Sequence, residues 1–309
     1  MTQSAVYAGV DVGGTFTKAA LLGPGGRILA QDRITSRGFS RRPYFAARIQ
    51  AVLSALSDRA RCRLRDIIAA GVGVPGPVDF GRGVVLSLTN IRGWTRYPLA
   101  RDLSRRLRIP VFVENDANCM VLAESRLGAG RGARHVLGVT LGTGVGGGLM
   151  LAGGIYRGPF FLGGEVGHIP ISSDGPDCPC GGSGCLERFV GNAALLERAR
   201  RVFGKRVCLE EISGKARRGN SRCRTFWREV GEEIGRALAG VVNTCGPEVI
   251  VVGGGVAAAG GDLLDAIEES VKRHAMKQIK GRIRVRRAAL GNDAGMIGAA
   301  LLAREQAAL

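Results

Sequence analysis

The chain has 309 residues, of which 45% are hydrophobic and 23% charged, and its 49 glycines cluster in short runs between apolar stretches. This composition allows a large buried core and excludes intrinsic disorder, and the length favours two domains that share a cleft. The formal net charge of +18 would suit a nucleic-acid partner, but the arginine clusters are dispersed without interleaved aromatic residues, so a solvated basic surface is favoured and nucleic-acid binding is not expected.

The first 115 or so residues alternate between strand and helix patterns, which predicts an α/β layer that begins with a hairpin. The expected strands are 6–12, 18–22, 67–74 and 111–113, and the expected helices are 45–56 and 99–107.

A second such layer is expected from about residue 136. Strands are expected over 136–155 around a glycine loop, at 249–252 and at 283–285, and helices at 187–203, 225–243 and 295–304. Segments 6–22 and 136–151 share one pattern, in which an apolar strand, a glycine turn with a threonine and a second apolar strand follow one another. This repeat predicts one hairpin in each domain, with both turns aimed at a shared cleft.

The first glycine turn has the chemistry of a phosphate loop. Gly13 and Gly14 let backbone N–H groups approach a phosphate closely, and Thr15 adds a hydroxyl donor in a run that extends to Lys18. Asp11, at the end of the preceding strand, is placed to hold the Mg²⁺ that accompanies ATP. By itself the turn is a modest signal, because many hairpins resemble it.

The second turn is a stronger signal, since many adjacent glycines are costly in a plain strand. It runs from Gly142 to Gly148 and includes Thr143 and Gly144. The run also fits the dinucleotide-binding pattern G-x-G-x-x-G, but that pattern needs a following helix and residues 149–155 predict a strand. We therefore expect a nucleotide held by two hairpins.

Taken in order, these motifs resemble the ROK family of sugar kinases and regulators, which has a two-domain, actin-like (ribonuclease H-like) ATPase fold. The resemblance covers nearly the whole chain. Its segments are 11–18, 73–77, 114–118, 142–148, 164–168, the cysteine cluster and 291–298. It implies domains at 1–117 and 118–294, with the C-terminal helix at about 295–309 closing the first.

The resemblance further implies ATP-dependent phosphorylation of a hexose, with glucose converted to glucose 6-phosphate as the first expectation. Asp116 matches the general base, since a carboxylate can accept the hydroxyl proton as the γ-phosphoryl group transfers. A helix N-cap is the alternative role for Asp116, and the two roles can coexist. The residues expected to contact the sugar are Gly76, Asn90, Asn115, Asp116, Glu165, His168 and Glu187, and Gly254 and Gly255 match a loop that borders adenosine.

Four residues have the spacing of a zinc site. His168, Cys178, Cys180 and Cys185 form a His-x9-Cys-x-Cys-x4-Cys set in a loop rich in glycine. One imidazole and three thiolates complete a tetrahedral site, which is typical of structural zinc. Such a site would fix Glu165 and Glu187 at one wall of the sugar pocket. Buried free thiols are the alternative.

Other assignments within the family stay open. An N-acetylhexosamine or fructose kinase is possible, because the segment 188–192 departs from the alanine- and serine-rich continuation of glucokinases. A sugar-responsive transcriptional regulator is also possible, but the helix-turn-helix domain of such relatives has no room before the strand at about residue 6. We expect no export signal, no membrane segment, a cytoplasmic location and a homo-oligomer, dimer or tetramer.

Overall fold

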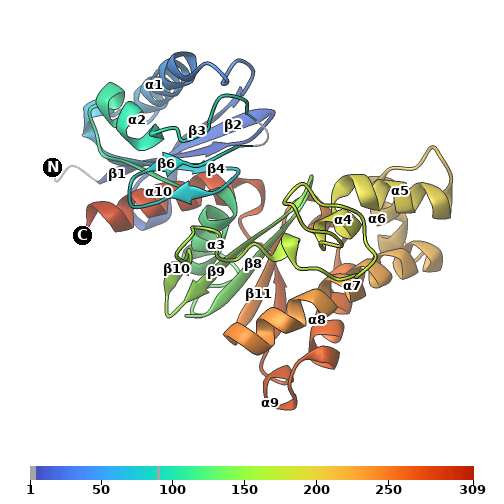
Figure 1. The fold of residues 1–309 in the computed structure, drawn as a ribbon. Helices are drawn as coiled ribbons and strands as arrows, with labels where there is room; N and C mark the ends of the chain where they lie inside the picture. The colour runs from blue at the N-terminus through green and yellow to red at the C-terminus, as the bar shows by residue number, and fades with distance from the viewer. Residues whose placement is uncertain (1–4, 89–90) are drawn as a thin grey trace. The chain divides into compact units, whose positions relative to one another are not determined.

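The computed structural model describes residues 5–88 and 91–309 (Figure 1). The described residues form two compact units. The first comprises the chain up to Leu127, Arg157–Gly163 and Asn292–Leu309, and the second comprises Gly128–Tyr156 and Gly164–Gly291. Each unit is an α/β layer built on its own five-stranded sheet.

The sheet of the first unit has the strand order β3-β2-β1-β4-β7. Its strands are β1 (Val6–Val12), β2 (Phe16–Leu22), β3 (Ile28–Thr35), β4 (Ile67–Val74) and β7 (Val111–Asn115). The first three form an antiparallel meander, whereas β4 and β7 run parallel to β1. A small two-stranded sheet, β5 (Val78–Asp79) with β6 (Val84–Val85), follows β4.

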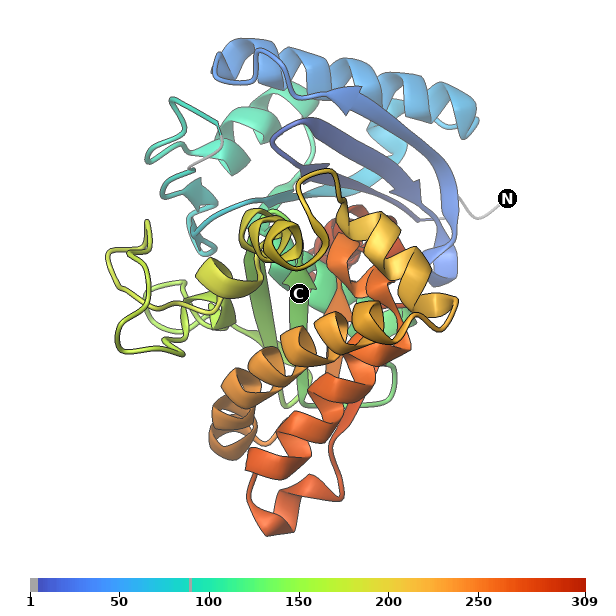
Figure 2. The ribbon, with the colours of Figure 1, turned by 90° about the vertical axis from the view of Figure 1, so that its right-hand side faces the viewer.

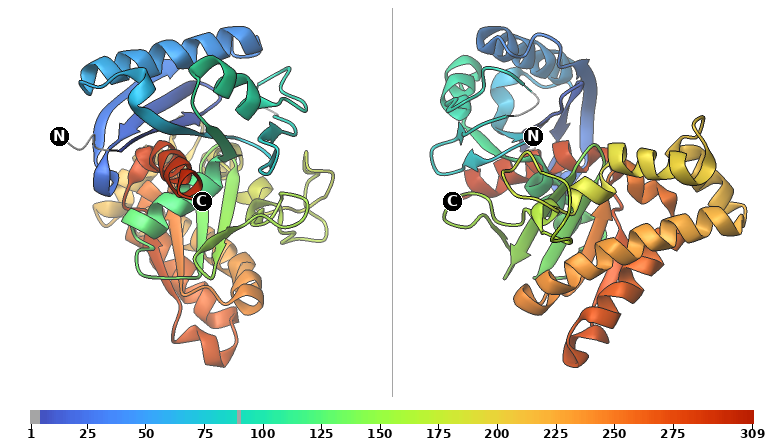
Figure 3. Two further views of the ribbon diagram at one scale, coloured as in Figure 1. Left: turned by 90° about the vertical axis from the view of Figure 1, so that its left-hand side faces the viewer. Right: turned by 45° about the vertical axis from the view of Figure 1, so that its right-hand side comes forward.

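Helices cover both faces of this sheet. The helices α1 (Arg42–Arg59) and α2 (Leu99–Leu107) pack on one another, and α3 (Asp116–Leu127) packs on α10 (Ala294–Ala307) beside β1 and β4 (Figures 1 and 3). The contact of α10 depends on glycine: a Cβ on Gly9 of β1 would lie 1.9 Å from the Met296 carbonyl oxygen, and one on Gly71 of β4 would lie 1.8 Å from that of Ala299. The last helix of the chain therefore packs directly on the backbone of the first sheet.

The sheet of the second unit repeats this topology, with the order β10-β9-β8-β11-β12. Its strands are β8 (Val136–Leu141), β9 (Val145–Leu151), β10 (Gly154–Tyr156), β11 (Val249–Gly253) and β12 (Arg284–Arg287). Again the first three are antiparallel, and β11 and β12 run parallel to β8. The hairpin that is repeated in the sequence thus supplies the first two strands of each sheet.

The helices of the second unit include two that lie side by side, α7 (Ser221–Cys245) and α8 (Gly261–His274) (Figure 2). The remaining helices are α4 (Glu187–Val190), α5 (Asn192–Phe203), α6 (Leu209–Arg217) and α9 (Lys277–Lys280), with the 3-10 turns η3 (Val166–His168) and η4 (Gly255–Ala259). Val230, Ile234 and Leu238 of α7 are fully buried. These residues therefore lie on the core face of the helix.

The structure adds elements that the sequence did not predict, such as β3, α6 and α8, and it differs from the expectation in a domain bound and in one helix. The expected first domain ended at residue 117, whereas the first compact unit includes α3 up to Leu127, because α3 packs on α10. The helix expected over 187–203 is interrupted at Gly191, whose backbone is extended. Among the described residues, no helix has both the length and the apolar character needed to cross a bilayer.

Candidate active site

The parallel strands of the first unit bring three carboxylates to one edge of their sheet. Asp11 is the penultimate residue of β1 and Asp116 directly follows β7, while the register aligns Asp11 with Gly73 and Gly73 with Glu114. Burial raises the pKa of the Cys119 thiol well above its usual value, and the charges of Glu114, Asp11 and Asp116 raise it further. Ligands of α/β proteins bind at such carboxyl ends of parallel strands.

The turn between β1 and β2 is fixed by a serine that the sequence analysis did not single out. The N–H of Gly13 donates to the Phe16 carbonyl at 3.0 Å. Ser36 donates twice, from its hydroxyl to the Gly13 carbonyl at 2.6 Å and from its N–H to the Thr15 carbonyl at 3.0 Å. Gly14 and Thr15, at the tip of the predicted phosphate turn, are exposed. The backbone of the turn is restrained by the hydrogen bonds of Gly13 and Ser36.

Asp11 is packed against the start of α10. A Cβ on Gly295 would lie 2.6 Å from Asp11 Oδ2, so glycine is required there. Burial raises the pKa of Asp11 to about 6, although the nearby Lys18 ammonium lowers it. Lys18 itself donates to the carbonyl of Asn292 and lies 3.8 Å from the Asp293 carboxylate. A buried carboxylate of this kind favours a cationic partner.

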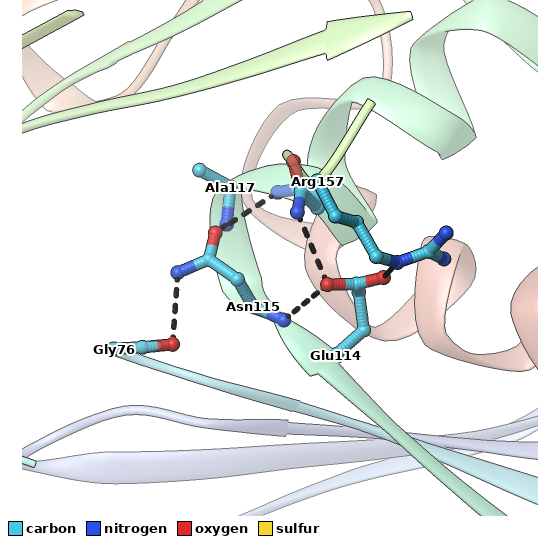
Figure 4. A network of polar contacts seen from close by, with 6 residues as sticks. Gly76, Glu114, Asn115, Ala117 and Arg157 are labelled. Atoms are coloured by element: carbon cyan, nitrogen blue, oxygen red, sulfur yellow. Dashed lines mark hydrogen bonds and ion pairs between the residues drawn. The ribbon is translucent and has the colours of Figure 1, made fainter. Parts of the chain in front are cut away.

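Asn115, an expected sugar contact, also caps α3 (Figure 4). Its Oδ1 accepts the N–H groups of Ala117 at 2.9 Å and of Asn118 at 3.1 Å. The N-cap role considered for Asp116 therefore belongs mainly to Asn115, although Asp116 Oδ1 also accepts the Ala117 N–H at 2.8 Å. Asn115 Nδ2 donates to the Gly76 carbonyl at 3.2 Å, and the second hydrogen of an amide nitrogen can serve a ligand.

Gly76 lies in the loop after β4, where its φ is +147° and a Cβ would meet the Ser87 carbonyl oxygen at 2.6 Å. The structure thus brings Gly76 and Asn115, two expected sugar contacts, together. Asn90, another expected sugar contact, lies outside the described residues.

In the second unit, Glu187 supports the glycine turn between β8 and β9. Its Oε2 accepts the N–H of Val145 at 2.9 Å, and a Cβ on Gly144 would lie 2.1 Å from the same oxygen. Thr143 is exposed at this turn. A cavity of about 700 Å³ is lined by Thr143 and Glu187 together with residues of α4 and α5, such as Arg188. Thr143, an expected nucleotide contact, and Glu187, an expected sugar contact, therefore line the same cavity.

Gly254 and Gly255 follow β11, beside the carboxyl end of β8. Gly253 is aligned with Thr140 of β8, and Gly254 has φ +87° with a hypothetical Cβ 2.2 Å from the Leu141 carbonyl oxygen. A Cβ on Gly255 would meet nothing within 4 Å. Both glycines thus lie at the same sheet edge as the β8–β9 turn.

The segment from Gly164 to His168 packs on β9. A Cβ on Gly147 would lie 2.2 Å from the Gly164 carbonyl oxygen, and one on Gly167 would lie 1.9 Å from that of Val145. Glu165 and His168 are half-buried, and burial is the main cause that raises the pKa of Glu165. The close backbone contact fixes the position from which both side chains extend.

The four residues expected to bind zinc form one cluster, since their ligand atoms all lie within 4.8 Å of one another. Cys178 Sγ is 3.6 Å from His168 Nδ1, and Cys180 Sγ is 3.6 Å from Cys185 Sγ. Ligands about 2.3 Å from a tetrahedral ion lie about 3.7 Å apart, whereas a disulfide needs about 2.05 Å. The donors and their spacing fit a metal site.

The fold and both sheet edges define a protein of the actin-like ATPase class, as expected from the sequence. The model of the ROK family matches residues 7–306, and the chain belongs to this family. The glucokinase of Thermotoga maritima is 32% identical over 96% of this chain and 97% of that protein. The glucokinase of Streptomyces coelicolor is 35% identical over 96% of this chain and 97% of that protein.

Among solved structures, a ROK family glucokinase from Streptomyces griseus, in complex with glucose and AMPPNP, is 34% identical to this chain. The similarity covers 97% of this chain and 100% of that one, with a TM-score of 0.82. The similarity in both sequence and fold therefore extends over both compact units.

Proposed function

We propose that this protein is an ATP-dependent sugar kinase that converts glucose to glucose 6-phosphate. The observation that carries the proposal is the placement of Asp116 next to the α3 cap, on the same sheet edge as Asp11 and the glycine turn. The glucokinase relatives support it, as does the S. griseus structure with glucose and AMPPNP.

In this mechanism Asp116 is the general base. A sugar hydroxyl is too weak an acid to ionise at neutral pH, so Asp116 accepts its proton while the γ-phosphoryl group transfers. Asn115 and the Gly76 loop orient the sugar. The hydrogen bond between Asn115 and Gly76 restrains both before the sugar binds.

The two glycine turns bind ATP. Gly14 and Thr15 donate to phosphate oxygens, and Thr143 and Gly144 of the second unit do the same. Gly13 lines the same turn, with its N–H bonded to the Phe16 carbonyl. Asp11 is suited to Mg²⁺, because a carboxylate is a hard oxygen ligand and a bound cation offsets the burial that raises its pKa. When present, Mg²⁺ would neutralise charge on the phosphates. Lys18 supports this turn through its bond to the Asn292 carbonyl.

The remaining contacts come from the second unit. Glu165 and His168 bind sugar hydroxyls from the segment packed on β9, and Gly254 and Gly255 border adenosine. Glu187 has two roles in this proposal, since its carboxylate supports the Val145 N–H and also lines the cavity that contains Thr143.

We also propose that the cluster of His168, Cys178, Cys180 and Cys185 holds one structural Zn²⁺. A site with four protein ligands leaves no position for a reactive water, so its contribution is to fold the loop. Because His168 is three residues after Glu165 and Cys185 two before Glu187, the metal would restrain both carboxylates.

The decisive experiment is a turnover screen over hexoses and N-acetylhexosamines, with ATP and a coupled assay of ADP release. We expect glucose to give the highest kcat/KM. A clear preference for an N-acetylhexosamine or for fructose would keep the kinase mechanism and change the substrate, whereas no sugar-dependent ADP release would contradict the kinase proposal itself.

The regulator alternative is tested by a mobility shift on bulk DNA with and without sugar. We expect no sugar-responsive shift at physiological salt. A cytoplasmic location and a dimeric or tetrameric state are part of the same proposal, to be tested by cell fractionation and by light scattering of the purified protein.

A further inference from the structure

An ion pair with a buried carboxylate lies next to Asn115, one of the residues proposed to bind the sugar (Figure 4). Arg157 Nε donates to Glu114 Oε2 at 2.6 Å, and the Glu114 side chain is only 2% exposed. The guanidinium carbon of Arg157 also lies 3.7 Å from the centre of the Phe80 ring. Arg157 is thus held by a charged hydrogen bond to Glu114 and by its contact with the Phe80 ring.

Glu114 uses its other oxygen to hold both ends of the turn that contains Asp116. Its Oε1 accepts the N–H of Asn115 at 2.9 Å and the side-chain amide of Asn118 at 3.0 Å. Asn118 Nδ2 and the Asn115 backbone are therefore tied to one carboxylate, with Asp116 between them. Rotation of Glu114 would release both bonds together.

Arg157 lies in a short segment that belongs to the first unit but interrupts the second unit in the sequence. The chain leaves the second unit after Tyr156, belongs to the first over Arg157–Gly163 and returns at Gly164. The N–H of Gly163 donates to the Arg157 carbonyl at 2.8 Å, which closes this piece into a loop. Glu165, a proposed sugar contact, directly follows Gly164.

We propose that Arg157 is a positioning residue for phosphoryl transfer. It neutralises and orients Glu114, and Glu114 in turn holds Asn115 and Asp116 in the orientation that meets the sugar. This role rests on the proposed kinase function. A buried carboxylate that loses its guanidinium partner takes up a proton or turns toward solvent, so the turn at Asp116 loses its restraint.

The test compares Arg157→Met, which keeps an unbranched apolar stem but removes the charge, with Arg157→Lys, which keeps the charge. The matched control is Arg126→Met, because Arg126 pairs with Glu305 at 2.7 Å from the other end of the same helix α3. We expect kcat with glucose to fall about 10- to 100-fold in Arg157→Met, since small misplacements of reacting groups are costly. Arg157→Lys should lose less, and Arg126→Met should stay within about two-fold of the parent chain.

The KM for ATP should change by less than about two-fold in all three variants, because Arg157 contacts Glu114 and Phe80, Arg126 pairs with Glu305, and these partners are not proposed ATP contacts. Equal losses of kcat in Arg157→Met and Arg126→Met would show general loosening of α3 and would overturn the proposal. Retention of the parent kcat in Arg157→Met would overturn it as well.

Amide hydrogen exchange supplies a readout that needs no enzyme activity. In Arg157→Met the peptide that covers residues 114–118 should exchange faster, whereas residues 121–127 should keep the exchange rates of the parent chain. If the parent chain phosphorylates no sugar but this local change occurs, the kinase proposal fails while the restraint of the turn by Arg157 stands. If the parent chain is active and residues 114–118 are unaffected, the positioning role fails alone.

Discussion

Asp11 and Asp116 share one edge of the first sheet, but their surroundings differ. Asp11 is packed against Gly295 of α10, and burial raises its pKa to about 6. Asp116 begins α3 and accepts the N–H of Ala117. The two carboxylates thus have different environments, which suits the different tasks proposed for them, a cation at Asp11 and a proton at Asp116.

The role of Asp116 predicts the effect of Asp116→Asn. We expect kcat to fall by about 10²- to 10⁴-fold, because the amide cannot accept the hydroxyl proton, while glucose affinity in calorimetry stays within a few-fold of the parent chain. The α3 cap is provided by Asn115, so the thermal midpoint should change little. An active Asp116→Asn enzyme would remove Asp116 from the mechanism.

The buried carboxyl of Asp11 predicts a dependence of stability on pH. Its folded-state pKa of about 6 lies above the ordinary aspartate pKa of 3.8, so the folded state holds the proton more tightly. The resulting stabilisation is fully present below pH 4 and is lost as the pH rises through 6. Without magnesium, the free energy of unfolding of the parent chain should therefore fall relative to Asp11→Asn by on the order of 2 kcal/mol across this window.

Urea unfolding of both proteins at several pH values checks this expectation. A constant difference between pH 4 and pH 7 would show that Asp11 does not titrate in this window.

At the scale of elements, the functional turns depend on glycines that let strands and loops approach closely. Gly144 makes room for the Glu187 carboxylate, Gly167 for the backbone of β9, and Gly254 for the backbone at the end of β8. Loops of the second unit are therefore held by backbone contacts as well as by side chains.

Adjacent glycines offer a matched test of this dependence. Gly254→Ala places a Cβ 2.2 Å from the Leu141 carbonyl oxygen at φ +87°, whereas Gly255→Ala meets nothing within 4 Å. We expect Gly254→Ala to lower the free energy of unfolding by about 2 kcal/mol or more and to raise the KM for ATP. Gly255→Ala should remain within about 0.5 kcal/mol of the parent chain by thermal unfolding, and equal effects would contradict the contact.

The cysteine loop yields a prediction about metal content. Purified protein should contain about one zinc per chain by elemental analysis, and Cys180→Ser should lose most of it. The control is Cys208→Ser, because Cys208 is also exposed but lies outside the cluster. Glucose turnover should fall with the zinc, since Glu165 and Glu187 flank the ligands. Metal-free protein with full turnover would separate the loop from catalysis.

At the scale of the whole molecule, the charge of +18 predicts a salt effect on one substrate only. ATP is anionic, so raising KCl from about 50 to about 300 mM should lower kcat/KM for ATP several-fold by screening. Glucose is neutral, and its kcat/KM at saturating ATP should change by less than about two-fold. The same loss for both substrates would indicate a general effect of salt on the enzyme.

The repeated hairpins, the actin-like class and the family follow from the sequence because they leave local traces. Glycine runs mark the turns after β1 and β8, and apolar runs mark the buried strands. The spacing of His168 and the three cysteines likewise brought together residues that the structure clusters.

Other features depend on contacts between distant positions, which no local pattern records. Arg157 and Glu114 are 43 residues apart, and Ser36 meets Gly13 across 23 residues. The break at Gly191 was missed because the apolar pattern continues through it. The N-cap was considered only as an alternative role for Asp116, whereas Asn115 provides most of it, since both residue types favour that position and only the geometry separates them.

The packing of α10 on Gly9 and Gly71 has a consequence for synthesis on the ribosome. One face of the first sheet stays uncovered until residues 294–307 are synthesised, and these residues follow all of the second unit in the sequence. Domains generally fold during translation in the order in which they are made, and exposed apolar faces aggregate. By this rule we expect the second unit to be complete before the first, and the nascent first unit to expose an apolar sheet face until residues 294–307 are made.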